Sequence, residues 1–354
     1  MTVRRSLIYA AGGLGAAAVA AVATGAVERR VIQSRRAHAA SSNGLGALRS
    51  EPVPVTCSDG LVLHTEIDDV APYADGHRAH HEDVTLVFVH GYALNLDCWH
   101  FQREALRGKH RMVFFDQRSH GRSERSGRDN ATFEQLGDDL ASVITALAPD
   151  GDVILVGHSM GGMAIIAFAE RHPELFVARV QGVALISTTA GGLRPHHTVS
   201  RWIPDRVGSL VTPRLVAALS MAPDLVDTAR RPGSNIGFLM TDIFAFGDRN
   251  VPAEQVEFLD KMLAGTSFDV LAEFFPNFTT LDKFEHLTSF AQVPTTIICG
   301  TKDRVTSIDH SRRMAETLPE ATLVECEGAG HMVLFESHDR VNAAIEDLVV
   351  AASG

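Results

Sequence analysis

An apolar, β-branched run starting at Asp152 leads directly into Gly157–Gly162, which reads GHSMGG, and then into a pattern with helical spacing. A strand, the pattern G-x-S-x-G and a helix together predict a sharp turn that exposes a serine hydroxyl at the helix N-terminus. Such a turn needs glycine at Gly157 and Gly161, because a Cβ there would collide with neighbouring backbone. The following helix is expected from about Ser159 to Arg171. A glycine-flanked serine alone is usually only a turn, but this context favours Ser159 as a nucleophile for acyl transfer.

Two later strand-like runs each lead into a loop with a residue suited to a catalytic triad. Residues 295–299 precede Asp303, and residues 321–326 precede His331. A serine hydroxyl becomes a good nucleophile only when a base removes its proton, and a carboxylate must hold that base in one tautomer. The chain order serine, acid, histidine also matches the one found with G-x-S-x-G. We therefore predict Ser159 as nucleophile, His331 as base and Asp303 as acid.

A further strand at Thr85–Val89 ends at His90-Gly91-Tyr92. Enzymes with this chain pattern stabilise an oxyanion with the amide after the nucleophile and an amide in the loop after an earlier strand. We assign these donors to the backbone N–H groups of Met160 and Tyr92. Tyr92 has an alternative role as a wall of the pocket only, and His90 is expected to be structural.

These segments resemble the α/β-hydrolase superfamily, in its branch of esterases, lipases, perhydrolase-type haloperoxidases and carbon–carbon bond hydrolases. The resemblance runs from about Pro52 to the C-terminus and includes residues 115–123, FDQRSHGRS, which are similar to the family's D-x-R-G-x-G-x-S loop. It implies an α/β fold with a doubly wound, mostly parallel sheet. Ser119 departs from the usual glycine, and Asp116 and Arg118 are expected to tie the loop together as an ion pair.

The nucleophile narrows the activities that the resemblance implies. Haloalkane dehalogenases and epoxide hydrolases of this fold use an aspartate where this chain has Ser159, so both are disfavoured. The expected activity is hydrolysis of a carboxylic ester without cofactor or metal. A carbon–carbon bond hydrolase, a perhydrolase and an acyltransferase remain open because they share these residues. A non-catalytic ligand-binding module remains a rival of another class, although an intact triad disfavours it.

The chain divides into four predicted parts: a tail and linker at 1–50, a first core part at 51–188, a helical cap at 189–290 and a second core part at 291–354. The cap is predicted because about 100 residues between Ser187 and Pro294 show helical apolar spacing and no β-rich run. Its aromatic and methionine side chains favour an apolar or lipid-like substrate, although each is individually expected to be ordinary packing. They are Phe238, Met240, Phe244, Phe246, Met262, Phe268, Phe274, Phe275 and Phe278.

The tail differs in charge from the rest of the chain. The net charge is −11, yet the first 50 residues carry seven Arg and one Glu. No basic surface is expected outside the tail, so no nucleic-acid partner is expected. Residues 6–27 hold no charge and are long enough to span a bilayer, which predicts membrane association or export. Two interpretations compete: a twin-arginine-like signal at Arg4-Arg5 with cleavage after Ala39, or a retained anchor.

The four cysteines, Cys57, Cys98, Cys299 and Cys326, fit neither a disulfide framework nor a metal-ligand spacing. They are expected to be small buried hydrophobes. Cys299 and Cys326 end two strands that should be neighbours, so a bridge between them stays open.

Overall fold

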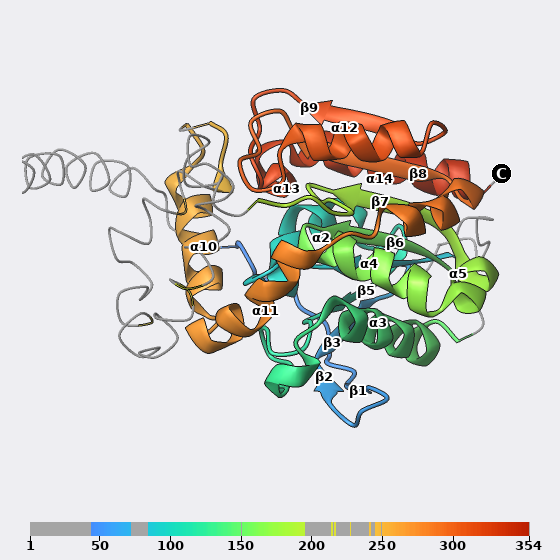
Figure 1. Ribbon diagram of the computed structural model, residues 1–354, viewed down its shortest axis with the longest axis horizontal. Coiled ribbons are helices and arrows are strands. Elements are labelled where there is room, and N and C mark those ends of the chain that lie inside the picture. Colours follow the sequence, from blue (N-terminus) through green and yellow to red (C-terminus); the bar gives the residue numbers. More distant parts are fainter. Residues whose placement is uncertain are drawn as a thin grey trace, which may run out of the picture.

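A seven-stranded sheet, mostly parallel, forms the centre of the protein (Figure 1). The computed structural model describes residues 44–71, 84–149, 151–194, 214, 216, 227, 241, 245–248 and 250–353. The strand order is β3-β5-β4-β6-β7-β8-β9, and only β3 runs antiparallel to its neighbour. The strands are β3 (Thr65–Asp68), β4 (Val84–Val89), β5 (Arg111–Phe115), β6 (Asp152–His158), β7 (Val180–Ile186), β8 (Thr295–Gly300) and β9 (Thr322–Cys326). Two short strands, β1 (Val55–Thr56) and β2 (Val62–Leu63), form a separate antiparallel pair.

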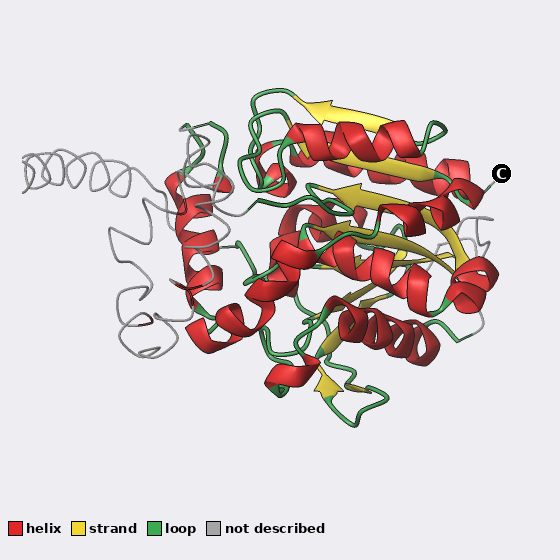
Figure 2. Cartoon of the chain, viewed as in Figure 1, coloured by secondary structure: helices red, strands yellow, loops and turns green. Residues whose placement is uncertain are grey.

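Helices cover both faces of the sheet (Figure 2). Successive side chains of a strand point to opposite faces, so Val87 and Leu155 join one apolar cluster while Phe88 and Val156 join the other. The first cluster includes residues of α3 (Phe133–Leu147), α4 (Met160–Arg171), α5 (Pro173–Arg179) and α12 (Ile308–Thr317). The second includes residues of α2 (His100–Leu106), α13 (Val333–Glu336) and α14 (His338–Ala352). Because both faces are buried, the strands read as continuous apolar runs.

The described part of the predicted cap contains two α-helices, α10 (Ala253–Ala264) and α11 (Phe268–Thr280), followed by the 3-10 helix η4 (Phe284–Gln292). Figure 1 places α10 and α11 beyond the ends to which the arrows of the parallel strands point. The cap sequence between 195 and 244 falls almost entirely outside the described residues.

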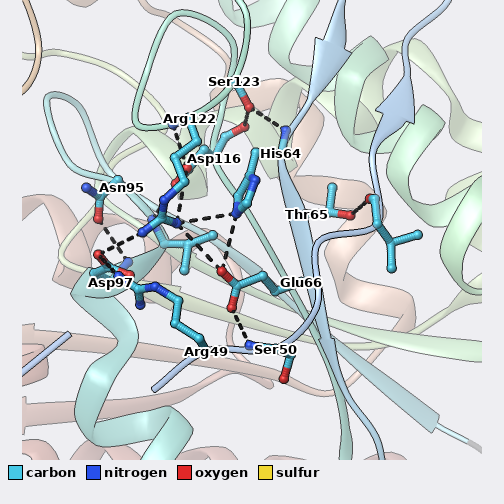
Figure 3. Close-up of polar contacts among 12 residues, drawn as sticks. Arg49, Ser50, His64, Thr65, Glu66, Asn95, Asp97, Asp116, Arg122 and Ser123 are labelled. Carbon is cyan, nitrogen blue, oxygen red and sulfur yellow. Dashed lines mark hydrogen bonds and ion pairs between the residues drawn. The ribbon is translucent and has the colours of Figure 1, made fainter. Parts of the chain in front are cut away.

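Residues 44–50, which the sequence assigns to the linker, pack onto the core instead. The Ser50 amide donates to Glu66 Oε2 at 3.0 Å, and Arg103 Nη1 donates to the carbonyl of Leu48 at 3.1 Å. Figure 3 shows Arg49 and Ser50 beside Glu66 and Asp97. The folded body therefore begins before Ser50.

The predicted membrane segment at 6–27 lies outside the described residues, and both interpretations of the tail stay predictions. Within the described part of the chain, no helix is both long and apolar enough to span a bilayer.

All four cysteines are free and buried. In the register of β8 and β9, Cys299 lies opposite Glu325, whereas Cys326 lies opposite Gly300. Cys299 and Cys326 therefore point to opposite faces of the sheet, which excludes the bridge between them in this arrangement.

Candidate active site

The turn between β6 and α4 holds Ser159 in an unusual backbone conformation, with φ 52° and ψ −117°. A non-glycine residue in this region costs about 1–3 kcal/mol and is retained where the surroundings enforce it. The two flanking glycines permit the turn. A Cβ on Gly157 would lie 2.7 Å from the amide nitrogen of Gly162, and one on Gly161 would lie 1.9 Å from the carbonyl oxygen of Val89.

The fold brings Ser159, His331 and Asp303 together from the ends of β6, β9 and β8. His331 Nε2 lies 3.0 Å from Ser159 Oγ, and His331 Nδ1 lies 2.9 Å from Asp303 Oδ2. A proton on Nδ1 is then donated to the carboxylate, which leaves the Nε2 lone pair to accept from the serine hydroxyl. The three residues thus form a hydrogen-bonded chain that is able to take a proton from the serine.

Asp303 is buried but well supplied with donors. Its Oδ1 accepts from the amides of Val305 at 2.8 Å and Thr306 at 2.9 Å, and Thr306 Oγ1 lies 3.0 Å from its Oδ2. Burial alone would raise the pKa of Asp303, but the charge and hydrogen bond of His331 and the two amides hold that pKa below its ordinary value. The carboxylate is therefore ionised at neutral pH. The sequence analysis did not predict a role for Thr306, although a threonine three residues after an Asp is a spacing that favours such local bonds.

His158, directly before Ser159, contacts the loop that carries His331. Its Nε2 lies 3.0 Å from the carbonyl oxygen of His331. Burial lowers the pKa of His158 to about 3, so the ring is neutral and carries its proton on Nε2 to donate to that carbonyl. The sequence analysis assigned His158 no role.

The loop after β4 lies against the nucleophile, because a Cβ on Gly91 would come within 3.1 Å of Ser159 Cβ. The next residue, Tyr92, donates its hydroxyl to the Leu271 carbonyl in α11, and its ring meets Phe278 edge-on with centroids 5.0 Å apart. Met160 is the first residue of α4, so its amide has no acceptor within the helix. Of the two residues whose backbone N–H groups are predicted as oxyanion donors, Met160 directly follows Ser159, and Tyr92 directly follows Gly91, which lies against Ser159.

His90 is fully buried beneath this loop. Its Nε2 accepts from the Gln117 amide at 2.9 Å, and its Nδ1 donates to the Gly91 carbonyl at 2.8 Å. Burial lowers the pKa of His90 to about 3, so it is neutral. Its contacts hold the Gly91 backbone in place.

The predicted ion pair between Asp116 and Arg118 is wrong. Arg118 is fully buried and forms a bidentate pair with Asp139, with both N–O distances 2.6 Å. Asp116 instead accepts from the amides of Leu96 at 2.7 Å and Arg122 at 2.8 Å. Asp116 therefore fastens two loops, one of them next to the Gly91 loop, while Arg118 fastens its own loop to α3.

Ser119, which replaces the glycine typical of this loop, keeps the left-handed conformation with φ 65°. Gly121 also has a positive φ of 54°, and a Cβ there would lie 2.3 Å from Asp116 Cγ. The Asp116 carboxylate therefore leaves no room for a side chain at Gly121, whereas the loop accommodates the serine side chain at position 119.

Several of the apolar cap residues pack into the body rather than standing free. Phe246, Met262 and Phe274 are all buried. Phe278 packs against Tyr92 and Phe133. Phe238, Met240 and Phe244 lie outside the described residues. Of the described residues, no group of three or more His, Cys, Asp or Glu side chains is arranged to hold a metal ion.

Comparison with known proteins identifies the family. Residues 84–338 match the family model described as alpha/beta hydrolase fold, and the chain belongs to this family. Epoxide hydrolase 1 of Caenorhabditis elegans is 25 % identical over 268 residues, which cover 74 % of this chain but only 63 % of that protein. Non-heme chloroperoxidase CPO-A1 of Kitasatospora aureofaciens is 29 % identical over 262 residues, which cover 72 % of this chain and 87 % of that protein. The solved structure of a thermophilic esterase from Thermogutta terrifontis has a TM-score of 0.65 at 24 % identity and covers 86 % of this chain and 100 % of that one. By its family and relatives, the protein is a hydrolase.

Proposed function

We propose that the protein cleaves carboxylic esters through an acyl-enzyme formed on Ser159. The observation that carries this proposal is the unbroken chain of hydrogen bonds from Ser159 Oγ through His331 to Asp303, at 3.0 Å and 2.9 Å. This arrangement activates a hydroxyl toward a carbonyl carbon. The match to an epoxide hydrolase carries less weight for the activity, because epoxide hydrolases of this fold use an aspartate nucleophile where this chain has Ser159.

In the proposed reaction, Ser159 Oγ attacks the ester carbonyl as His331 Nε2 takes its proton. The amides of Met160 and Tyr92 donate to the oxyanion of the tetrahedral intermediate. His331 then gives the proton to the leaving alcohol, and a water activated by the same nitrogen releases the acid. Asp303 stays ionised throughout and stabilises the protonated ring.

The proposal is tested by labelling and by turnover. A fluorophosphonate probe should form an adduct on Ser159 in the wild type and none in Ser159→Ala. The labelled wild type should lose hydrolysis of a 4-nitrophenyl ester in proportion to its labelling. A wild type that neither labels nor hydrolyses any ester would favour the non-catalytic binding module instead.

For the substrate we propose an apolar, lipid-like acyl group, on the support of aromatic side chains of the cap that stay partly exposed, such as Phe268 and Phe275. An apolar pocket gains about 0.8 kcal/mol per buried methylene, so kcat/KM should rise several-fold for each added carbon until the pocket is filled. The measurement is kcat/KM for 4-nitrophenyl acetate through decanoate. A flat profile would exclude this substrate class and move the proposal to a small polar ester or to carbon–carbon bond cleavage.

Perhydrolysis is a second candidate, favoured by the 29 % identity to a protein named non-heme chloroperoxidase. It needs the same acyl-enzyme, with hydrogen peroxide in place of water as the acyl acceptor. Adding peroxide to an acetate ester should then yield peracetic acid at a rate above that of Ser159→Ala. If only acetate and no peracetic acid is formed in the presence of peroxide, ester hydrolysis remains the proposed activity.

A further inference from the structure

The loop of the catalytic histidine and the segment that leads into cap helix α10 are joined backbone to backbone. The amide of Met332 donates to the Ala245 carbonyl at 2.9 Å. A Cβ on Gly330 would lie 2.4 Å from the Gly247 amide nitrogen, and a Cβ on Gly247 would lie 2.3 Å from the Gly328 carbonyl oxygen. The two segments approach so closely that neither glycine has room for a side chain.

One carboxylate accepts hydrogen bonds from both segments of this junction. Glu336, the last residue of α13, accepts from the Gly330 amide with Oε1 at 2.7 Å. Its Oε2 accepts from the amides of Gly247 at 2.8 Å and Asp248 at 3.1 Å. One oxygen thus holds the residue directly before His331, and the other holds the chain entering the cap.

The chemistry of the donors calls for a carboxylate rather than an amide at this position. All three partners are backbone N–H groups, and an ionised carboxyl offers two acceptor oxygens, whereas a glutamine side chain offers one. Burial raises the pKa of Glu336, and the nearby charge of Asp248 adds to this, while the three amides oppose it. Among the described residues no cation pairs with the carboxylate, so its charge is compensated by these amides.

We propose that Glu336 is a positioning residue that holds His331 and the entrance of the cap in one fixed arrangement. The inference rests on the proposed function, because it concerns the base of the triad. It goes beyond that function in making turnover and chain-length preference depend on a residue that touches neither substrate nor triad. A displacement of about 1 Å at a catalytic group costs up to about a hundredfold in rate, so loss of the Gly330 contact should be visible in kcat.

The test compares Glu336→Gln with Glu346→Gln. Glu346 lies on α14 and pairs with His110 and Lys109, so its variant controls for the loss of a carboxylate elsewhere on the fold. Rates are expressed per active site titrated with fluorophosphonate, which removes the effect of misfolded protein. We expect Glu336→Gln to lower kcat about tenfold or more on both acetate and octanoate esters, and to reduce the preference for octanoate. Glu346→Gln should stay within about twofold of the wild type in both.

A merely structural Glu336 would lower the melting temperature and the titratable fraction but leave kcat per titrated site and the chain-length preference unchanged. Either quantity staying unchanged would overturn the proposal. Glu336→Asp, which keeps the charge but shortens the reach, serves if the glutamine variant does not fold, with the same two expectations. The ¹⁵N shifts of the His331 ring should move in the Glu336 variants and not in Glu346→Gln. That reading needs no substrate, so it separates failure of this inference from failure of the proposed function.

Discussion

Left-handed backbone recurs in the loops that follow three neighbouring strands of the sheet. Ser159, Ala93 and Ser187 are all non-glycine residues with positive φ, and they follow β6, β4 and β7 respectively. Thr306 donates to the Ser187 carbonyl at 2.7 Å, which ties one of these turns to the acid of the triad. Because the conformation costs free energy at each position, neighbouring contacts must hold it.

Substitution of the triad should show that its members act as one unit. Ser159→Ala and His331→Ala should each reduce kcat by about a thousandfold or more, and the double variant should lose little beyond that. Asp303→Asn should be severe as well, because the ring loses the partner that fixes its tautomer. The measurement is kcat on one ester with circular dichroism as the check of folding. Near-normal turnover in Asp303→Asn would require a different acid.

The sequence located these three residues because each follows a strand by a short, recognisable loop. Thr306 is signalled only by its spacing of three residues from Asp303, which the sequence analysis did not use. Glu336 could not be located from a local pattern, because its role arises from contacts with Gly247 and Asp248, which the fold brings close. The same reason explains the error over Asp116 and Arg118. Two residues apart in a loop, they point to different partners, which only the tertiary structure supplies.

At the scale of elements, the segment at 44–50 completes a buried charge cluster. Arg103 is nearly fully buried, and it pairs with Glu66 and Asp68, both at 2.7 Å. Ser50 donates to both carboxylates, through its amide to Glu66 and through its hydroxyl to Asp68. Buried charges need their full set of partners, because an unsatisfied one is costly. The segment is therefore part of the core in energetic terms, although its composition resembles a linker.

Two truncations should separate the tail from this segment. A chain starting at residue 44 should keep the melting temperature and activity of the full body. A chain starting at residue 51 loses the partners on Ser50 and Leu48 and should melt at a lower temperature, since 1 kcal/mol corresponds to about 2–4 °C in a domain of about 150–250 residues and to somewhat less in this larger body. Calorimetry of both truncations is the measurement. Equal melting temperatures would show that the cluster is satisfied without the segment.

The strands were predictable from their apolar runs, but their register was not. A shift of one residue decides which face a side chain meets, and no local signal in 295–299 or 321–326 specifies it. Cys299 and Cys326 illustrate this, because the register of β8 and β9 places Cys326 opposite Gly300 rather than opposite Cys299, and so excludes a disulfide between the two cysteines.

For the whole molecule, three buried neutral histidines predict how stability depends on pH. Burial lowers the pKa to about 3 for His90, about 3 for His158 and about 4 for His120, against about 6.5 when unfolded. Below pH 6.5 the unfolded chain binds protons that the folded chain does not, so the free energy of unfolding falls as pH falls from about 6.5 toward 4. Above pH 6.5 this contribution is fully present.

Each of these histidines adds about 1.4 kcal/mol per pH unit to that slope. Urea unfolding of the wild type at pH 7.5, 6 and 5 measures it. His120→Gln, which leaves the triad untouched, should make the slope shallower by about one proton, with pH 7.5 as the reference point. An identical slope in that variant would mean that His120 is already protonated in the folded protein.

The predicted membrane segment at 6–27 is tested on the full chain. We expect the full chain to sediment with membranes and the chain starting at residue 44 to remain in the supernatant, because the apolar run is removed. Replacing Arg4 and Arg5 with lysine should block export under the twin-arginine interpretation, whereas an unchanged location would support a plain anchor. Membrane binding by the shortened chain would assign the contact to the body.

The nucleophile and its base stand 172 positions apart along the chain, and the base follows the last strand of the sheet. During synthesis the residues of the serine turn therefore leave the ribosome long before His331 is made. Under the proposed function, a chain that ends before His331 carries the serine without its base, so we expect it to have no hydrolase activity. Hydrolysis then requires a chain that extends beyond β9 and the loop of His331.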